Sequence, residues 1–393
     1  MRKILITMAA LAFCGGAVAE LADGLYAAFD TSMGSFTCRL DYAEAPVTCA
    51  NFAGLAEGSQ HWIDPETGSI RSDPFYDDLI FHRVITNFMI QGGCPLGNGT
   101  SGPGYAFPDE FVPTTNHYEN AGTLVMANSG PDSNGSQIFV TVVPYPNLDA
   151  SKYMVFGNVI DGIGVVTNIG AAATTGPTGN PKDRPLVDVV MNQVRILRIG
   201  TDAENFDPLT QPLPEVTPRP LAITHTAELE VSATTITNQC EVQIFNSANL
   251  SGWSNLGEKY FPVAVASWEQ PASTNRSAEF FKAAQVYYPQ AVTVFSNIEG
   301  HTLTFTNATE SFVFSPATGG TGTCNIVGNP DTLVFWAEWT SKPYVGSVVF
   351  DPANFVPFQF TLSPNGICNG YWWNDVDWIY IGEFSFTDTP PAP

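Results

Sequence analysis

The sequence predicts a mainly β protein with two domains. At 393 residues the chain is long for one domain. Short apolar stretches recur along it between clusters of Gly, Pro and Asn, which is typical of strands and turns in an antiparallel barrel or sandwich. A Pro-rich segment, residues 201–221, separates two groups of such stretches. We therefore expect one domain at residues 20–200, a linker at 201–221 and a β-rich module at 222–389.

The first residues have the layout of a cleavable secretory signal. A basic start precedes an apolar stretch from Ile4 to Phe13, and Ala17 to Ala19 supplies the small residues of a cleavage site. Residues 1–19 are therefore expected to be removed, which predicts a periplasmic or secreted protein. The alternative is a lipid-modified Cys14, although Phe13 is bulky for the position before such a cysteine. No later apolar run is long enough to span a bilayer, so no membrane insertion is expected.

The charge balance limits the classes of partner. Only 13% of the residues are charged, and 38 acidic residues outnumber 15 Lys and Arg for a net charge of -23. Nucleic acids and anionic membranes need clustered cations, so neither is an expected partner. The acidity also has a simpler interpretation, which is that it keeps an exported protein soluble.

Six cysteines remain once the signal is removed. They are Cys38, Cys49, Cys94, Cys240, Cys324 and Cys368. None lies in a CxxC pair, which argues against a zinc site, and an even number favours disulfides in an oxidising compartment. Cys38 and Cys49, on either side of a short loop, are one candidate pair, and Cys324 and Cys368 are a second.

The elements of the first domain can be taken in order. Two strands are expected between Leu25 and Leu40, followed by a helix over 47–57 that Pro46 begins, since the missing N–H costs nothing in the first turn. Residues 62–78 are rich in Asp, Pro, Gly and Ser without an apolar period, which indicates an inserted surface loop. Further strands are expected at 79–85, 88–91, 123–127, 137–142, 155–159 and 189–199.

The linker and the second domain follow. The prolines and acids of residues 201–220 predict a chain that forms neither helix nor sheet and stays extended. Beyond it, the alternation of Thr302 to Thr306 indicates a strand with one buried face. Similar strands are expected at 227–231, 241–245, 291–295, 311–314, 332–339, 346–350, 355–362 and 378–386. The module is therefore expected to be all-β, sandwich-like or a small barrel, and a division into two subdomains near residue 290 is left open.

Two segments carry a resemblance to a known family. Residues 81–93 (FHRVITNFMIQGG) and 126–139 (MANSGPDSNGSQIF) resemble the signature strings of the cyclophilins. Residues 97–105 resemble the family's glycine-rich loop, and residues 148–157 its last pocket segment. The resemblance implies a closed eight-stranded antiparallel β-barrel capped by two helices. It also implies peptidyl-prolyl cis-trans isomerase activity on proline-containing polypeptides, with no cofactor and no metal.

The same resemblance assigns roles to residues of this chain. Arg83 is the implied catalytic residue. The implied substrate-binding residues are Phe88, Met89, Gln91, Gly99, Ala127, Asn128, Gln137, Phe139, Leu148 and Tyr153. Phe88, Met89, Phe139 and Leu148 would line a proline pocket, and Gln91 and Asn128 would bind the substrate backbone. Asn147 stands where many members carry Trp, and Tyr153 where His is frequent.

The chemistry of the reaction explains why these residue types suffice. An X-Pro bond crosses a barrier of about 18–20 kcal/mol because rotation breaks amide resonance. The twisted state has a pyramidal proline nitrogen, so a catalyst needs an apolar grip on the ring and a donor aimed at that nitrogen. Arg83 can be that donor. Taken singly, the aromatic residues could equally be barrel core, Arg83 a surface cation, and His82 a structural histidine.

Two other functions remain open from the sequence. The first domain could bind proline-containing segments with little turnover. The second could act through exposed aromatic residues on another protein, a surface or a carbohydrate, because flat rings stack on apolar ligand faces. Its tryptophans Trp336, Trp339, Trp372, Trp373 and Trp378 motivate this hypothesis, and filling a β core is the alternative role for them.

Overall fold

The computed structural model describes most of the chain up to residue 289. It leaves out residues 1–20, 111–117, 147, 149–152, 226–228, 237–238, 249, 251, 262–264 and 273–279, and beyond 289 it describes the course of eight strands without their side chains. The expected signal, Asn147 and the strand expected at 291–295 therefore lie outside the described residues.

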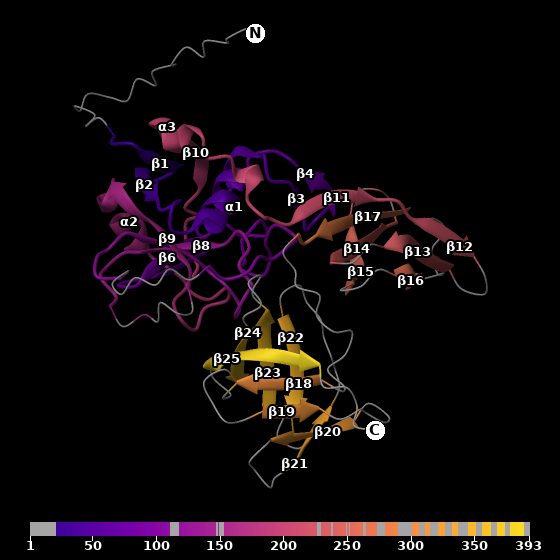
Figure 1. Cartoon of the computed structure of the whole chain (residues 1–393). Coiled ribbons are helices and arrows are strands. Elements are labelled where there is room, and N and C mark those ends of the chain that lie inside the picture. Colours follow the sequence, from indigo (N-terminus) through magenta and orange to yellow (C-terminus); the bar gives the residue numbers. More distant parts are fainter. Residues whose placement is uncertain are drawn as a thin grey trace.

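Eight antiparallel strands form the sheet of the N-terminal part (Figure 1), in the order β10-β1-β2-β9-β7-β8-β6-β5. Their bounds are β1 (Gly24–Thr31), β2 (Gly34–Leu40), β5 (Arg83–Ile85), β6 (Met89–Gly92), β7 (Thr123–Met126), β8 (Ile138–Thr141), β9 (Val155–Asp161) and β10 (Met191–Ile199). Each lies within or beside a stretch predicted as a strand.

The sheet is a curled half-barrel and not the closed barrel that the resemblance implied. Its edge strands β10 and β5 do not pair, and only an isolated bridge between Ile80 and Val190 joins the segments beside them. A loop covers β5 instead, since the Val84 N–H donates to the carbonyl of Asp183 at 2.9 Å. The closure prediction is therefore wrong, because this loop uses a backbone group that closure would pair with β10.

Helix α1 (Pro46–Glu57) packs beside the sheet and begins at Pro46, as predicted. A distant carboxylate caps it, because Glu110 accepts the backbone N–H groups of Val47 at 3.1 Å and Thr48 at 2.8 Å. A second helix, α2 (Ile163–Gly170), contacts β2 and β6. The apolar pattern did not locate it, although the resemblance implied a second helix.

The main core lies between α1 and the inner face of the sheet. Phe52 of α1 lies with its ring centroid 5.4 Å from that of Phe156 in β9. Ile90 and Val140, from the adjacent strands β6 and β8, belong to the same fully buried cluster. Burial of each such side chain contributes about 1.5–3 kcal/mol relative to exposure, so this face fixes the register of β6 and β8.

The predicted pairing of Cys38 with Cys49 is wrong. Both are free, buried thiols, and the Cys49 thiol donates to the carbonyl of Phe156 with the sulfur 3.6 Å from the oxygen. Burial raises the pKa of both thiols. Proximity in sequence did not bring the two sulfurs together, because the helix turns Cys49 toward β9. The side chains of Cys324 and Cys368 are not among those described.

Residues 62–78 are more ordered than the predicted surface loop. They hold a two-stranded hairpin of β3 (Trp62–Ile63) and β4 (Ile70–Arg71), which we call the inserted hairpin. Trp62 and Phe75 are buried and meet edge to face with centroids 4.8 Å apart. The loop prediction failed because these aromatic residues lie far apart among polar ones and leave no period to detect.

The segment predicted as an extended linker is also structured. It contains α3 (Thr201–Glu204), the short 3-10 helix η1 (Pro208–Thr210) and β11 (Glu215–Arg219). Pro208 begins η1, where its missing N–H costs nothing, and Pro218 lies in β11, an edge strand. The prolines therefore occupy positions that tolerate them, and the expectation that this segment forms neither helix nor sheet is wrong.

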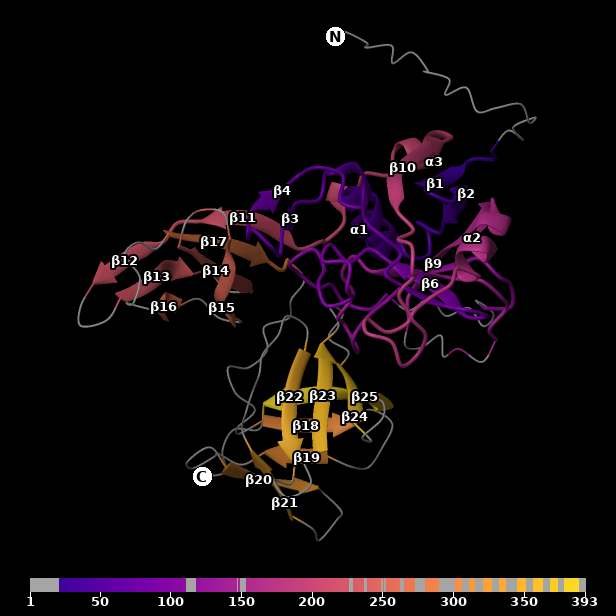
Figure 2. The ribbon, with the colours of Figure 1, turned by 180° about the vertical axis from the view of Figure 1, so that it is seen from behind.

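The rest of the described chain is all-β. β11 pairs in a four-stranded sheet of order β11-β17-β14-β15, which we call the docking sheet. A three-stranded sheet, β12-β13-β16, lies beyond it in both views (Figures 1 and 2). The bounds are β12 (Ala222–His225), β13 (Leu229–Ile236), β14 (Cys240–Ser247), β15 (Ser254–Phe261), β16 (Val265–Ala272) and β17 (Phe280–Tyr287).

The last strands form a closed barrel in chain order. They are β18 (His301–Phe305), β19 (Ser311–Phe314), β20 (Thr321–Ile326), β21 (Thr332–Trp336), β22 (Val345–Phe350), β23 (Val356–Leu362), β24 (Cys368–Trp373) and β25 (Trp378–Asp388). The expected all-β class therefore holds for the described strands of this region. The expected division near residue 290 stays a prediction.

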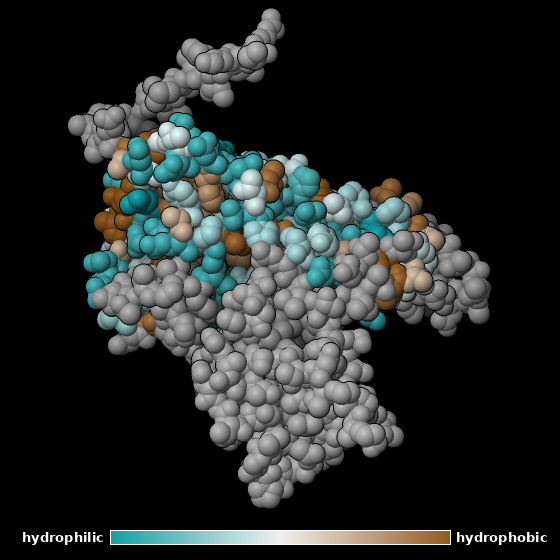
Figure 3. All heavy atoms as spheres, in the orientation of Figure 1, coloured by the Kyte–Doolittle hydropathy of each residue, from teal (hydrophilic) through white to brown (hydrophobic). Residues whose placement is uncertain are grey.

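The described surface is mixed in character. On the face shown in Figure 3, hydrophilic residues cover much of the surface and hydrophobic ones occur in small groups. Within the described ranges, no helix has the length and apolar character needed to cross a membrane.

Candidate functional site

The outer face of the sheet carries the predicted site residues. Arg83 of β5 lies directly opposite Gln91 of β6, and Gln91 lies opposite Phe139 of β8. Side chains that face each other across strands point to the same side of a sheet. Met89 is two residues from Gln91 on β6 and shares that side. The strand order thus brings Arg83, Met89, Gln91 and Phe139 onto one surface, opposite the face that holds the main core.

Apolar side chains form a cluster on this outer face, which we call the apolar cluster. Met89 and Phe139 are buried in it, and Phe88, Leu148 and Tyr153 are partly buried against them. The Phe139 ring centroid is 5.7 Å from that of Tyr153 in an edge arrangement and 6.4 Å from that of Phe88. All five are predicted site residues. The structure adds Tyr118, Val125 and Val155, which sequence reasoning missed because they look like ordinary strand or loop residues.

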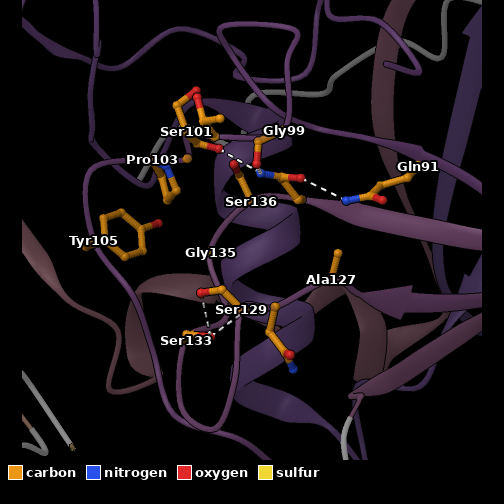
Figure 4. A pocket seen from close by; sticks show the side chains of 14 residues that line it. Gln91, Gly99, Ser101, Pro103, Tyr105, Ala127, Ser129, Ser133, Gly135 and Ser136 are labelled. Atoms are coloured by element: carbon orange, nitrogen blue, oxygen red, sulfur yellow. Dashed lines mark hydrogen bonds between the residues drawn. The ribbon is translucent and has the colours of Figure 1, made fainter. Parts of the chain in front are cut away.

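A polar pocket adjoins this cluster and has a volume of about 410 Å³ (Figure 4). Five predicted site residues line it, namely Gln91, Gly99, Ala127, Asn128 and Gln137. Its other walls come from Thr100, Ser101, Gly102, Pro103, Tyr105, Ser129, Ser133, Gly135 and Ser136. Ala127 belongs to both regions, since it also packs against the apolar cluster. The predicted residues therefore divide into two adjoining regions.

A chain of hydrogen bonds links Arg83 to the wall of the polar pocket. The guanidinium Nη1 of Arg83 donates to Gln91 Oε1 at 3.4 Å, and Gln91 Nε2 donates to Gln137 Oε1 at 3.0 Å. Gln137 Nε2 then donates to the carbonyls of Gly99 at 2.8 Å and Ser101 at 3.0 Å (Figure 4). Each side-chain amide accepts through its oxygen and donates through its nitrogen, so all these hydrogen bonds run in one direction, from Arg83 to the loop carbonyls.

Asp183 holds the other side of the Arg83 guanidinium. Its Oδ2 lies 3.7 Å from Arg83 Nε, and its side chain is 8% exposed against 38% for Arg83. The same residue anchors β5 through its carbonyl. Sequence reasoning missed Asp183, because it lies 100 residues from its partner, in a stretch of the sequence without a motif.

Two buried groups lie beside this network. His82 is 5% exposed, and burial, with smaller contributions from the charges of Arg83 and Arg184, lowers the pKa of His82 to about 4. The imidazole is therefore neutral near pH 7, which agrees with a structural role. Burial opposes ionisation of Cys94, but hydrogen bonds, including one from the Gly99 N–H at 3.2 Å, lower the pKa of its thiol overall. Its sulfur thereby anchors the glycine-rich loop.

The comparison with known proteins decides the family. The model of the family described as "Cyclophilin type peptidyl-prolyl cis-trans isomerase/CLD" matches residues 26–196. Peptidyl-prolyl cis-trans isomerase B of Streptomyces anulatus is 48% identical over 174 residues, which cover 44% of this chain and 97% of that protein. The chain belongs to the cyclophilin-type isomerase family. We call the matched part the cyclophilin domain.

A second relative agrees with this assignment. Peptidyl-prolyl cis-trans isomerase-like 1 of Aspergillus niger is 44% identical over 173 residues, covering 43% of this chain and 93% of that protein. A crystal structure of a cyclophilin-type isomerase from Cryptosporidium parvum is 28% identical, with a TM-score of 0.37, over 44% of this chain and 98% of that one. The docking sheet and the barrel lie outside the part that the family model matches.

Proposed function

We propose that Arg83 drives the isomerisation by donating a hydrogen bond to the proline nitrogen of a substrate held on the apolar cluster. The observation that carries this proposal is the pairing of Arg83, Gln91 and Phe139 across three neighbouring strands. A cation and an apolar surface then lie on one face, within reach of a single X-Pro unit. Phe88, Met89, Phe139, Leu148 and Tyr153 would hold the ring, and Gln91 and Asn128 the flanking backbone.

The donor acts selectively on the transition state. In planar X-Pro amides the nitrogen lone pair is delocalised and accepts no hydrogen bond, whereas in the twisted state it is localised and can accept one. An interaction present only in the transition state lowers the barrier instead of merely tightening binding. Arg83 stays charged at any relevant pH, and Asp183 and Gln91 restrict its orientation.

The size of this contribution is limited. A hydrogen bond with a charged donor is worth about 1.5–3 kcal/mol, which corresponds to a rate factor of roughly 10 to 150. The remaining acceleration would come from removing water around the polar amide and from holding a partly twisted conformer. The mechanism needs no covalent intermediate and no proton transfer.

Isomerisation of a proline-containing peptide tests the role of Arg83. The full chain should accelerate exchange, and Arg83→Ala should reduce kcat/KM by about 10- to 150-fold while the far-ultraviolet circular dichroism stays unchanged. Arg83→Lys keeps the positive charge and loses the planar guanidinium, so its kcat/KM should lie between those of wild type and Arg83→Ala. Equal rates for wild type and Arg83→Ala would overturn the mechanism. Equal rates for wild type and buffer would favour binding without turnover.

The second part of the proposal concerns the place of action, which is outside the cytoplasm on folding polypeptides. The support is the layout of residues 1–19, with its basic start, apolar stretch and small residues. Sequencing the N-terminus of the protein purified from the periplasm or the medium of an expressing cell tests it. The expected first residue is Glu20, and an intact Met1 in the cytoplasmic fraction would contradict the proposal.

A further inference from the structure

The docking sheet rests against the cyclophilin domain next to the polar pocket. Figures 1 and 2 both show β11 and β17 beside β3 and β4. A buried cluster joins the two parts, formed by Ile63 and Tyr105 of the cyclophilin domain and by Val216, Phe245, Ala284, Val286 and Tyr288 of the docking sheet and its end. These side chains are nearly inaccessible to solvent, so the contact is a packed interface.

The inserted hairpin is shaped for this contact at Gly68. Its φ is +62°, and a Cβ atom added there would lie 2.4 Å from Cγ of Phe245. No side chain fits at that distance, so the Phe245 ring packs directly on the hairpin backbone. Lys282 of β17 adds a polar contact, because its Nζ donates to Ser69 Oγ at 3.0 Å. The hairpin thus lies between the sheet and the pocket wall.

Two hydrogen bonds from different sides hold the wall of the polar pocket at residues 103–105. The carbonyl of Pro103 accepts the Ile63 N–H at 2.9 Å, and the carbonyl of Gly104 accepts Nε2 of Gln243 at 2.8 Å. Pro103 and Tyr105 both line the polar pocket. Gln243 comes from β14, which lies outside the part of the chain that the family model matches. One wall of the pocket therefore depends on a residue of the docking sheet.

We propose that Gln243 is a positioning residue for substrate selection. By fixing Gly104, the docking sheet shapes the polar pocket for a polar side chain two positions from the proline. Met89 and Gln91 are two residues apart on one face of β6, about 7 Å, which is also the span of two residues of extended substrate. The hydroxyl, amide and backbone groups around the pocket suit a side chain such as Asn. This inference rests on the proposed function.

The test compares the full chain with two glutamine variants. Gln243→Ala removes the bond to Gly104. Gln285→Ala is the matched control, because Gln285 lies on β17 of the same sheet and accepts from Arg219 at 2.7 Å. The substrates are two peptides that carry Asn or Gly two positions from the proline. In Gln243→Ala we expect KM for the Asn peptide to rise about three- to tenfold with kcat unchanged, and KM for the Gly peptide to stay constant.

Hydrogen exchange on the free protein gives a readout that does not depend on activity. Amides of residues 99–105 should exchange at least about threefold faster in Gln243→Ala and at the wild-type rate in Gln285→Ala. Gly68→Ala displaces Phe245 from the other side of the interface. It should therefore also raise KM for the Asn peptide and speed the exchange of residues 99–105. Unchanged exchange in Gln243→Ala, or an equal change of KM for both peptides, would overturn the inference. A wild type without activity but with the expected exchange pattern would overturn the proposed function alone.

Discussion

Acidification should destabilise the cyclophilin domain through His82. Its pKa is lowered from 6.5 to about 4, because burial disfavours the charged imidazole. Below pH 6.5 the unfolded chain binds a proton that the folded chain does not, so stability is fully present above pH 6.5 and falls toward pH 4. The difference corresponds to about 3 kcal/mol in total, of which about 2 kcal/mol is lost by pH 5.

The pH dependence of wild-type stability alone cannot isolate the contribution of His82. Burial raises the pKa of Asp109, so its contribution has the opposite sign, present at low pH and lost as the pH rises through the folded value. The comparison is therefore between wild type and His82→Gln, using the opening free energy of β6 from hydrogen exchange at pH 7 and pH 5. His61→Gln is the control, because it makes the same substitution at a histidine that is exposed in the folded chain.

The expected result is a smaller loss of stability in the variant. Between pH 7 and pH 5, wild type should lose about 2 kcal/mol more than His82→Gln, and His61→Gln should follow wild type. If wild type and His82→Gln lose the same amount, the imidazole is not desolvated in the way its burial implies, and the reasoning fails.

Three further predictions concern residues with defined partners. Asp183→Asn should lower kcat/KM about three- to tenfold with little change in KM, because Arg83 loses the carboxylate that orients it; an unchanged kcat would contradict this. Cys38 and Cys49 should resist a thiol reagent in the folded chain and react after unfolding without added reductant; a requirement for reductant would show that they are oxidised. Glu110→Ala should lower the free energy of unfolding by about 0.5–2 kcal/mol, measured by urea titration, since it caps α1; no change would mean that water replaces the cap.

The parts of the fold that the sequence predicted depend on local pattern. The strands around Ile90 and Val140 were found because each is a short apolar stretch between clusters of Gly, Pro and Asn, which is typical of a strand between turns. Helix α1 was found because Pro46 suits a first turn. The signature strings also brought Arg83, Gln91 and Phe139 into one hypothesis, and strand pairing puts these three residues on one face.

The parts that were missed depend on contacts between distant segments. Asp183 acquires its role only when its loop covers the edge of β5, and the same loop prevents the closure that the resemblance implied. Pro208 and Pro218 looked like signs of a segment without helix or sheet, yet one begins a helix and the other lies in an edge strand. A proline signals where hydrogen bonds are missing, and only the tertiary structure shows whether that position needed one.

The network from Arg83 to the glycine-rich loop explains why amides connect the two regions of the site. A carboxylate at Gln91 could accept from Arg83 but could not donate to Gln137, and a cation at Gln91 could not accept from Arg83. Only a group with both an acceptor and a donor transmits the orientation of the guanidinium to the loop carbonyls without adding a charge. A neutral network of this kind adds no further charge beside the Arg83–Asp183 pair, while its geometry stays tied to the loop that Gln243 holds from the other side.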